Sequence, residues 1–195
     1  MLFGYDWPRV HAAVNDLPPA LLPISVLFDL LGGFFKRESL KAAAFWTLVA
    51  GVAGTGAAIV AGLLAEDAAE HSEQAHEIME THETLAFIVL AIFGALAVWR
   101  IVRRGVWSEK EQPVALTAGV IGVAILLYTA MLGGKLSFDH AVGVPAARLQ
   151  AIAAERAGHH HDEDEEPAAP KAGTSTLPAA DTTHAHPGSP DTAKH

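Results

Sequence analysis

The stretch AAAFWTLVAGVAGTGAAIVAGLL, residues 42–64, decides the fold class. It contains no charged residue, and a helix of this length crosses the ~30 Å hydrocarbon core of a bilayer. Ala50 and Gly54, and again Ala58 and Gly62, stand at small-xxx-small spacing. Small residues at this spacing let helix backbones approach closely in lipid. The stretch therefore predicts a transmembrane helix packed against other helices.

Three further apolar stretches of similar length accompany it, namely Leu17–Phe35, Thr84–Val102 and Val114–Leu132. A soluble domain of this size would have too little polar surface to cover four such segments. In lipid, backbone polar groups must be paired within each span, which makes these stretches helical. We expect an all-α membrane protein, a four-transmembrane-helix bundle over residues 17–144, with the lipid bilayer as its first partner.

The remaining segments are polar and flank this bundle. Residues 1–16 are expected to form an outer N-terminal segment, and residues 145–158 a short amphipathic helix at the membrane interface, stopped by Gly158. Residues 159–195 are a His-rich, acidic tail without periodic apolar residues, so we expect this tail to be disordered. No internal repeat is evident in the sequence beyond the general likeness of two helical hairpins.

Basic residues predict the orientation, because cytoplasmic connections hold an excess of Lys and Arg close to span ends. The connection at residues 66–83, between the second and third spans, holds seven acids and no base, and the net charge is −9. An acidic outer face argues against nucleic-acid binding. We expect a multi-pass protein of the bacterial inner membrane with both termini periplasmic. The basic residues lie after the first and third spans: Lys36, Arg37, Lys41, Arg100, Arg103, Arg104 and Lys110.

Asp29 is the one acid inside a predicted span. A carboxylate at mid-bilayer costs ~2.5–3.5 kcal/mol on insertion scales, so Asp29 should face the bundle or lean toward the cytoplasmic surface. Its role stays open between a proton or ion function and a structural contact with a partner such as Thr55 or a nearby lysine.

The eleven histidines all map to the predicted outer side. His11 precedes the first span, His82 begins the third and His140 follows the fourth, so these three should approach one another near the outer interface. Neutral imidazole at that depth is a good ligand for haem iron or for Zn, Cu and Ni. The alternative is that these side chains only cap helices or hydrogen-bond polar groups such as Asp16, Asp139 and the backbone.

Several segments carry a resemblance to a known family. His11–Ala20 is similar to the family's opening pattern His-Pro-x-x-Val-His-Phe-Pro-Ile-Ala, with His11 and Pro18 kept and Asp16 in place of the second histidine. The chain thus resembles, over about residues 11–144, the domain-of-unknown-function 2231 family of bacterial inner-membrane proteins. Further segments that resemble family positions are Phe28–Gly32, Ala61–Leu64, His82, Gly133–Leu136 and His140–Val144.

The resemblance implies a role in membrane electron transfer, because such domains are similar to ones attached to, or encoded beside, cytochrome c and Rieske-type modules. It also implies that His11, His82 and His140 act together. We expect a membrane-embedded subunit that holds a b-type haem near the periplasmic face through two of these three, with His82 first and His140 or His11 opposite. Its partners would be membrane or periplasmic electron-transfer proteins.

Two other function classes are compatible with the sequence. A transition-metal handling protein would collect Zn, Ni or Cu outside the membrane, since histidine-rich tracts commonly bind metal. A structural subunit would brace a larger complex or a homo-oligomer. No nucleophile with a paired base and no phosphate-binding glycine loop appears, so we expect no catalysis from this chain alone. The candidate metal ligands are His71, His76, His159, His160, His161, His184 and His186.

Overall fold

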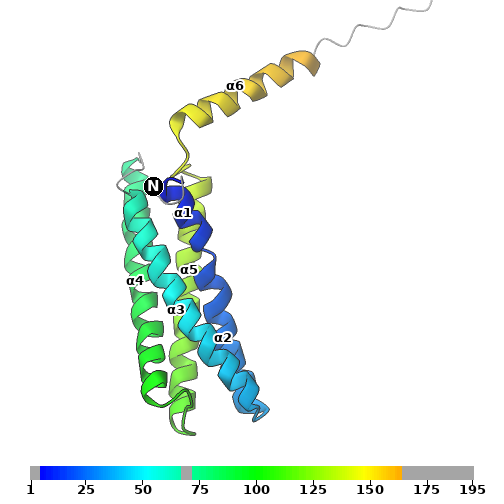
Figure 1. Ribbon diagram of the computed structural model, residues 1–195. Helices are drawn as coiled ribbons and strands as arrows, with labels where there is room; N and C mark the ends of the chain where they lie inside the picture. Colours follow the sequence, from blue (N-terminus) through cyan, green and yellow to red (C-terminus); the bar gives the residue numbers. More distant parts are fainter. Residues whose placement is uncertain (1–4, 67–71, 164–195) are drawn as a thin grey trace, which may run out of the picture. The chain divides into compact units, whose positions relative to one another are not determined.

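The structure, a computed structural model, describes residues 5–66 and 72–163, with side chains up to residue 157. Helices make up the described part of the chain, which confirms the all-α prediction (Figure 1). They are α1 (Trp7–Val14), α2 (Leu17–Phe34), α3 (Glu38–Glu66), α4 (Glu73–Val102), α5 (Glu111–Phe138) and α6 (Ala146–Glu163).

Four of these segments are long and apolar enough to cross a membrane, as predicted. The first runs through α1 and α2, and the others are α3, α4 and α5. The helices extend beyond the apolar stretches: α4 begins at Glu73 rather than Thr84, and α5 ends at Phe138 rather than Leu132. Ser72 caps α4, because its hydroxyl accepts a hydrogen bond from the Ala75 N–H at 3.3 Å. This cap explains why the polar first turns of α4 are helical.

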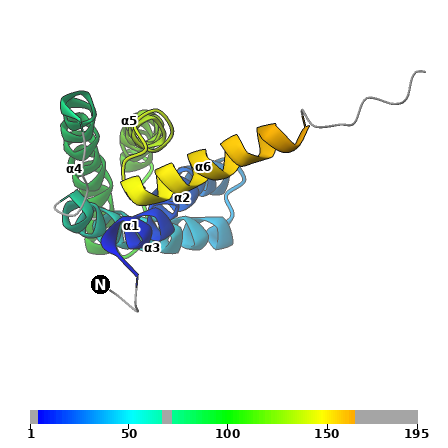
Figure 2. The same ribbon diagram turned by 90° about the horizontal axis from the view of Figure 1, so that it is seen from above.

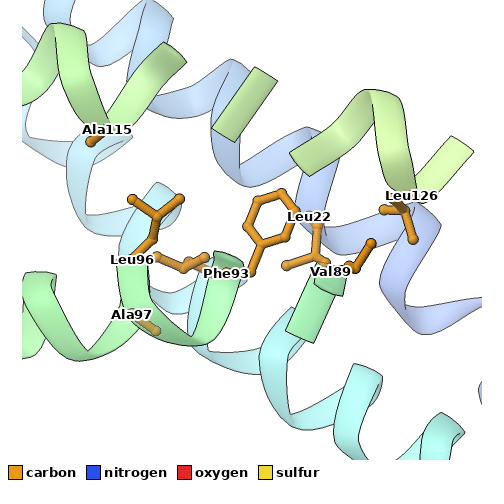
Figure 3. Packing of buried hydrophobic residues seen from close by; sticks show 8 residues of the cluster. Leu22, Val89, Phe93, Leu96, Ala97, Ala115 and Leu126 are labelled. Carbon is orange, nitrogen blue, oxygen red and sulfur yellow. The ribbon is translucent and has the colours of Figure 1, made fainter. Parts of the chain in front are cut away.

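The four long helices form a ring in which α2 packs on α3, α3 on α4, α4 on α5 and α5 on α2 (Figures 1 and 2). Leu22 and Phe93 are fully buried at its centre, in one cluster with Val89 (Figure 3). Glycines let the helices approach this cluster: a Cβ at Gly51 would lie 2.6 Å from Leu22 Cδ2, and one at Gly122 would lie 2.7 Å from Phe93 Cε2. The predicted role of small residues in packing is therefore seen in both hairpins.

These two contacts belong to an internal repeat with an offset of 71 residues, the separation that also links Asp29 to Arg100. Leu22 and Gly51 pair in the first hairpin, α2–α3, as Phe93 and Gly122 do in the second, α4–α5. The hairpins run in the same direction and are related by an approximate twofold axis along the bundle. The sequence shows only the general likeness of two hairpins, because many equivalent positions, such as Leu22 and Phe93, hold different residue types.

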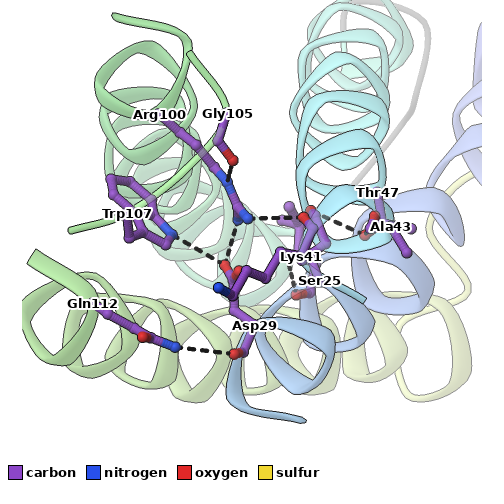
Figure 4. Close-up of polar contacts among 11 residues, drawn as sticks. Ser25, Asp29, Lys41, Ala43, Thr47, Arg100, Gly105, Trp107 and Gln112 are labelled. Carbon is purple, nitrogen blue, oxygen red and sulfur yellow. Dashed lines mark hydrogen bonds and ion pairs between the residues drawn. The ribbon is translucent and has the colours of Figure 1, made fainter. Parts of the chain in front are cut away.

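Asp29 and Arg100 occupy equivalent positions in the two repeats and meet in a buried ion pair (Figure 4). The Arg100 side chain is 1% exposed, and its Nη1 donates to Asp29 Oδ2. Trp107 Nε1 donates to the same oxygen at 3.3 Å. Asp29 does face the bundle, but the suggested partners, Thr55 or a lysine, were wrong. Arg100 was counted among the loop residues, whereas it is buried in the last turn of α4.

Arg100 also joins the helices through backbone carbonyl groups. Its Nη2 donates to the Lys41 carbonyl at 2.9 Å, and its Nε donates to the Gly105 carbonyl at 3.0 Å. Gln112 Nε2 on α5 donates to the Asp29 carbonyl at 3.3 Å. Arg100 thus joins α4 to α2 and α3, and Gln112 joins α5 to α2, at the end of the bundle away from α1.

Most of helix α6 falls in a second compact unit, which begins at Gln150. The helix runs to Glu163, past Gly158, so the expected stop at this glycine does not end the helix. Leu149 is exposed and Ile152 is partly buried. Its location at a membrane surface stays a prediction.

Candidate ligand-binding site

His11 is positioned by α1 against α3. The Asp6 carboxylate caps α1 by accepting from the Arg9 N–H at 3.4 Å, and Pro8 stands in the first turn, where its missing N–H costs nothing. The His11 Nδ1 lies 2.9 Å from the Ala58 carbonyl oxygen. Gly62 makes room for this contact, since a Cβ there would lie only 3.1 Å from His11 Cε1.

His82 has the same environment in the second repeat. Its Nδ1 lies 2.9 Å from the Thr129 carbonyl oxygen on α5. A Cβ at Gly133 would lie 3.1 Å from His82 Cε1. Each residue of this set stands 71 positions after its counterpart in the first repeat, as Arg100 does after Asp29. Two independent helix pairs therefore hold two imidazoles in the same way.

The acceptor determines the tautomer of both rings. A carbonyl oxygen can only accept, so each Nδ1 carries the hydrogen and donates it. In a neutral imidazole the lone pair then lies on Nε2. A backbone carbonyl bonded to one ring nitrogen is the usual way in which a ligating histidine is oriented, with the other nitrogen left for a metal or haem iron. Both rings therefore present a suitable donor atom.

A cavity of about 620 Å³ lies between the helices at this end of the bundle, and both His11 and His82 line it. Small-molecule and cofactor sites commonly enclose about 300–1,000 Å³. All but six of its lining residues fall into pairs separated by 71 positions, the separation of Asp29 and Arg100. The cavity thus lies at the interface of the two repeats, which line it largely with equivalent positions.

Charged side chains also line the cavity. Three acidic residues, Asp16, Glu66 and Glu83, and one basic residue, Arg9, are among its lining residues. Val142–Val144, which follow α5 in the chain, also line the cavity. The remaining walls are mostly apolar or small side chains, so a ligand here would meet an apolar interior with a few polar groups, as cofactor sites do.

The other histidines predicted as ligands are placed differently. His140 is partly buried in the turn after α5 and does not line the cavity, so the structure unites His11 and His82 without it. His76 Nε2 lies 3.4 Å from Glu80 Oε1, and both side chains are exposed on α4. No group of three His, Cys, Asp or Glu that could hold a metal ion occurs among residues 5–66 and 72–157. The side chains of six further candidates lie outside the described residues: His71, His159, His160, His161, His184 and His186.

Sequence reasoning missed Arg9 and the carbonyl acceptors Ala58 and Thr129. One signal could have found the acceptors: Gly62 and Gly133 each follow a histidine at the same spacing. Such a doubled His–Gly spacing indicates two helices that admit an imidazole at the same depth. Arg9 carried no such signal, because a single arginine before a span also fits a solvated face.

The comparison with known families agrees with this topology. Residues 8–146, the greater part of the chain, match the family model described as "Predicted membrane protein (DUF2231)". Apart from Trp7, the match covers all four candidate spans, and it includes Val142–Val144, which line the cavity. No curated protein and no solved structure matches the chain.

Proposed function

The chain belongs to the DUF2231 family of predicted membrane proteins, and we propose that it is an electron-transfer subunit that holds a b-type haem between His11 and His82. The observation that carries the proposal is the pair of equivalent imidazoles on one cavity, each with Nδ1 on a backbone carbonyl. Haem supplies reversible one-electron exchange when it is bound through two axial histidines.

The donor set fits haem better than a bare metal ion. A structural zinc site takes four protein ligands and a catalytic one three. In the described part of the chain, no third ligand joins the two histidines in such a group. Haem needs only two axial nitrogens, because its own ring supplies the other four. His11 and His82 would hold the haem, and it would supply electron transfer rather than chemistry on a bound substrate.

The choice of the second ligand follows from the cavity. The sequence analysis left His140 and His11 as alternatives for the group opposite His82. His11 lines the cavity and His140 does not, so we assign the pair to His11 and His82. The partners would be membrane or periplasmic electron-transfer proteins of the kind that the family resemblance implies.

The test is an absorption spectrum of the full chain, produced with adequate haem and purified in detergent. We expect a Soret band that sharpens and shifts on reduction, and we expect His11→Ala and His82→Ala each to abolish or strongly perturb it. His140→Ala and His76→Ala serve as matched controls and should leave the spectrum unchanged. A folded, colourless preparation without extractable haem would sink the proposal.

We also propose that the cavity end of the bundle faces the periplasm, with both chain termini on that side. The support is the cluster of basic residues at the opposite end, in the first and third connections. The chain has no cysteine, so single cysteines can report sidedness. Ser72→Cys and Ser175→Cys should react with a membrane-impermeant thiol reagent in spheroplasts, whereas Ser108→Cys should not. Labelling of the Ser108 variant alone would show that the protein has the opposite orientation in the membrane.

A further inference from the structure

We propose that Arg9 binds the carboxylates of the molecule held in the cavity and thereby selects one of two orientations that the repeat would otherwise make equivalent. This inference rests on the proposed haem, whose two propionates are its only charged substituents. It adds to the two histidine ligands a residue that binds the propionates and determines the orientation of the haem.

Arg9 has unused donors beside the cavity. Its Nε lies 3.6 Å from Asp6 Oδ1, and its side chain is 66% exposed. In the part of the chain that the structure describes, Nη1 and Nη2 make no hydrogen bond or ion pair. Arginine binds carboxylates through two parallel N–H groups, a geometry that needs these terminal nitrogens. Arg9 is therefore prepared to hold an acidic group without first losing a strong partner.

The other charges of the cavity exclude alternative positions for such a group. Asp16, Glu66 and Glu83 are the remaining ionisable side chains that line it besides the two histidines. A carboxylate placed beside any of them would be repelled at short range. Among the described lining residues, Arg9 alone carries a permanent positive charge. An acidic ligand edge has one favourable location, next to α1.

The two repeats place different charges at equivalent positions, and this difference bears on the orientation of the ligand. A twofold rotation that exchanges His11 and His82 also carries the position of Arg9 onto that of Glu80, 71 residues later, the separation of Asp29 and Arg100. The same rotation carries Ala12 onto Glu83. The two imidazoles alone would accept the ligand in either of two orientations. Glu80 does not line the cavity, but Arg9 and Glu83 do. The positive charge on α1 and the negative charge on α4 favour the orientation with its acidic edge toward α1.

The test compares natural haem with haem whose two propionates are esterified, in the full chain in detergent. The rate of haem loss is measured by transfer to excess apomyoglobin. We expect Arg9→Ala to release natural haem about 10- to 100-fold faster than the wild type, because a charge-assisted contact is lost. Esterified haem should leave the wild type and Arg9→Ala at similar rates. Arg9→Lys should restore part of the retention, and Arg148→Ala, an exposed arginine that does not line the cavity, should have no effect.

Proton NMR of the haem methyl groups tests the orientation itself. The wild type should give one dominant set of shifted methyl resonances, and Arg9→Ala should give a second set of clearly increased intensity. Equal release of natural haem from wild type and Arg9→Ala, with a single set in both, would overturn the inference while leaving the histidine ligands in place. A wild type that binds no haem would instead overturn the proposed function, so the two failures are distinguishable.

Discussion

Arg100→Met is expected to lower the free energy of unfolding in detergent by about 3–5 kcal/mol, the usual cost of removing one partner from a buried ion pair. The Arg100 side chain is 1% exposed and is the partner of the Asp29 carboxylate. Its loss leaves a charge at the helix interface, together with the Lys41 and Gly105 carbonyl groups that it joined. Methionine keeps much of the side-chain volume, so the effect reports the polar contacts. Denaturant titration followed by tryptophan fluorescence would measure it.

Arg103 provides the matched control for this prediction. It lies one turn away, its side chain is 47% exposed, and it pairs with Glu111 at 2.9 Å. Exposed ion pairs contribute about 0–1 kcal/mol, so Arg103→Met should have a small effect. Equal destabilisation by both substitutions would contradict the assignment of Arg100 as the residue that joins α4 to α2 and α3.

A double substitution separates the pair from its individual charges. Asp29→Leu with Arg100→Met removes both ions, and apolar replacement of a buried pair is often neutral or stabilising. We expect the double variant to regain much of the stability lost by Arg100→Met. A double variant that is no more stable than Arg100→Met would show that the remaining contacts of Arg100, and not an unpaired Asp29, account for the loss.

The fold was predictable because lipid leaves so few alternatives. Stretches of about 20 apolar residues must form helices there, so the number and order of spans follow from composition. The pairing of Asp29 with Arg100 did not follow. A basic residue at the end of a span has the same sequence signal whether it enters a loop or turns into the bundle, and only the packing of four helices decides between these outcomes.

The candidate site was predictable in part for the same reason. Topology placed His11, His82 and His140 at one end, but depth and direction depend on how far each helix continues. Helix α5 extends to Phe138, and His140 then lies in the turn beyond it, away from the lining. The repeat was hard to see because many equivalent positions hold different residues, as Leu22 and Phe93 do, and few hold the same one, as His11 and His82 do. Helix packing in lipid requires complementary side-chain shapes, and many different combinations of residues provide them.

Gly62→Leu and Gly133→Leu are expected to weaken haem retention by about 10- to 100-fold each, the range for loss of a contact that orients a ligating histidine. A Cβ at either position would lie 3.1 Å from a ring carbon of His11 or His82, and a leucine side chain extends further. The imidazole must then leave its carbonyl acceptor and lose its direction. Leucine favours the helix, so α3 and α5 should remain intact.

Gly56 and Gly94 supply controls, because nothing lies within 4 Å of a Cβ built at either position. Gly56→Leu and Gly94→Leu should leave haem loss, measured by transfer to apomyoglobin, unchanged. The Nδ1–H resonances of ¹⁵N-histidine-labelled protein give a second readout that needs no haem, since each substitution should shift one bonded proton and spare the other. Because the repeat makes the two imidazoles equivalent, both glycine substitutions should act with similar strength. A strong effect at Gly133 with none at Gly62 would leave His82 as the one oriented ligand and remove His11 from the site.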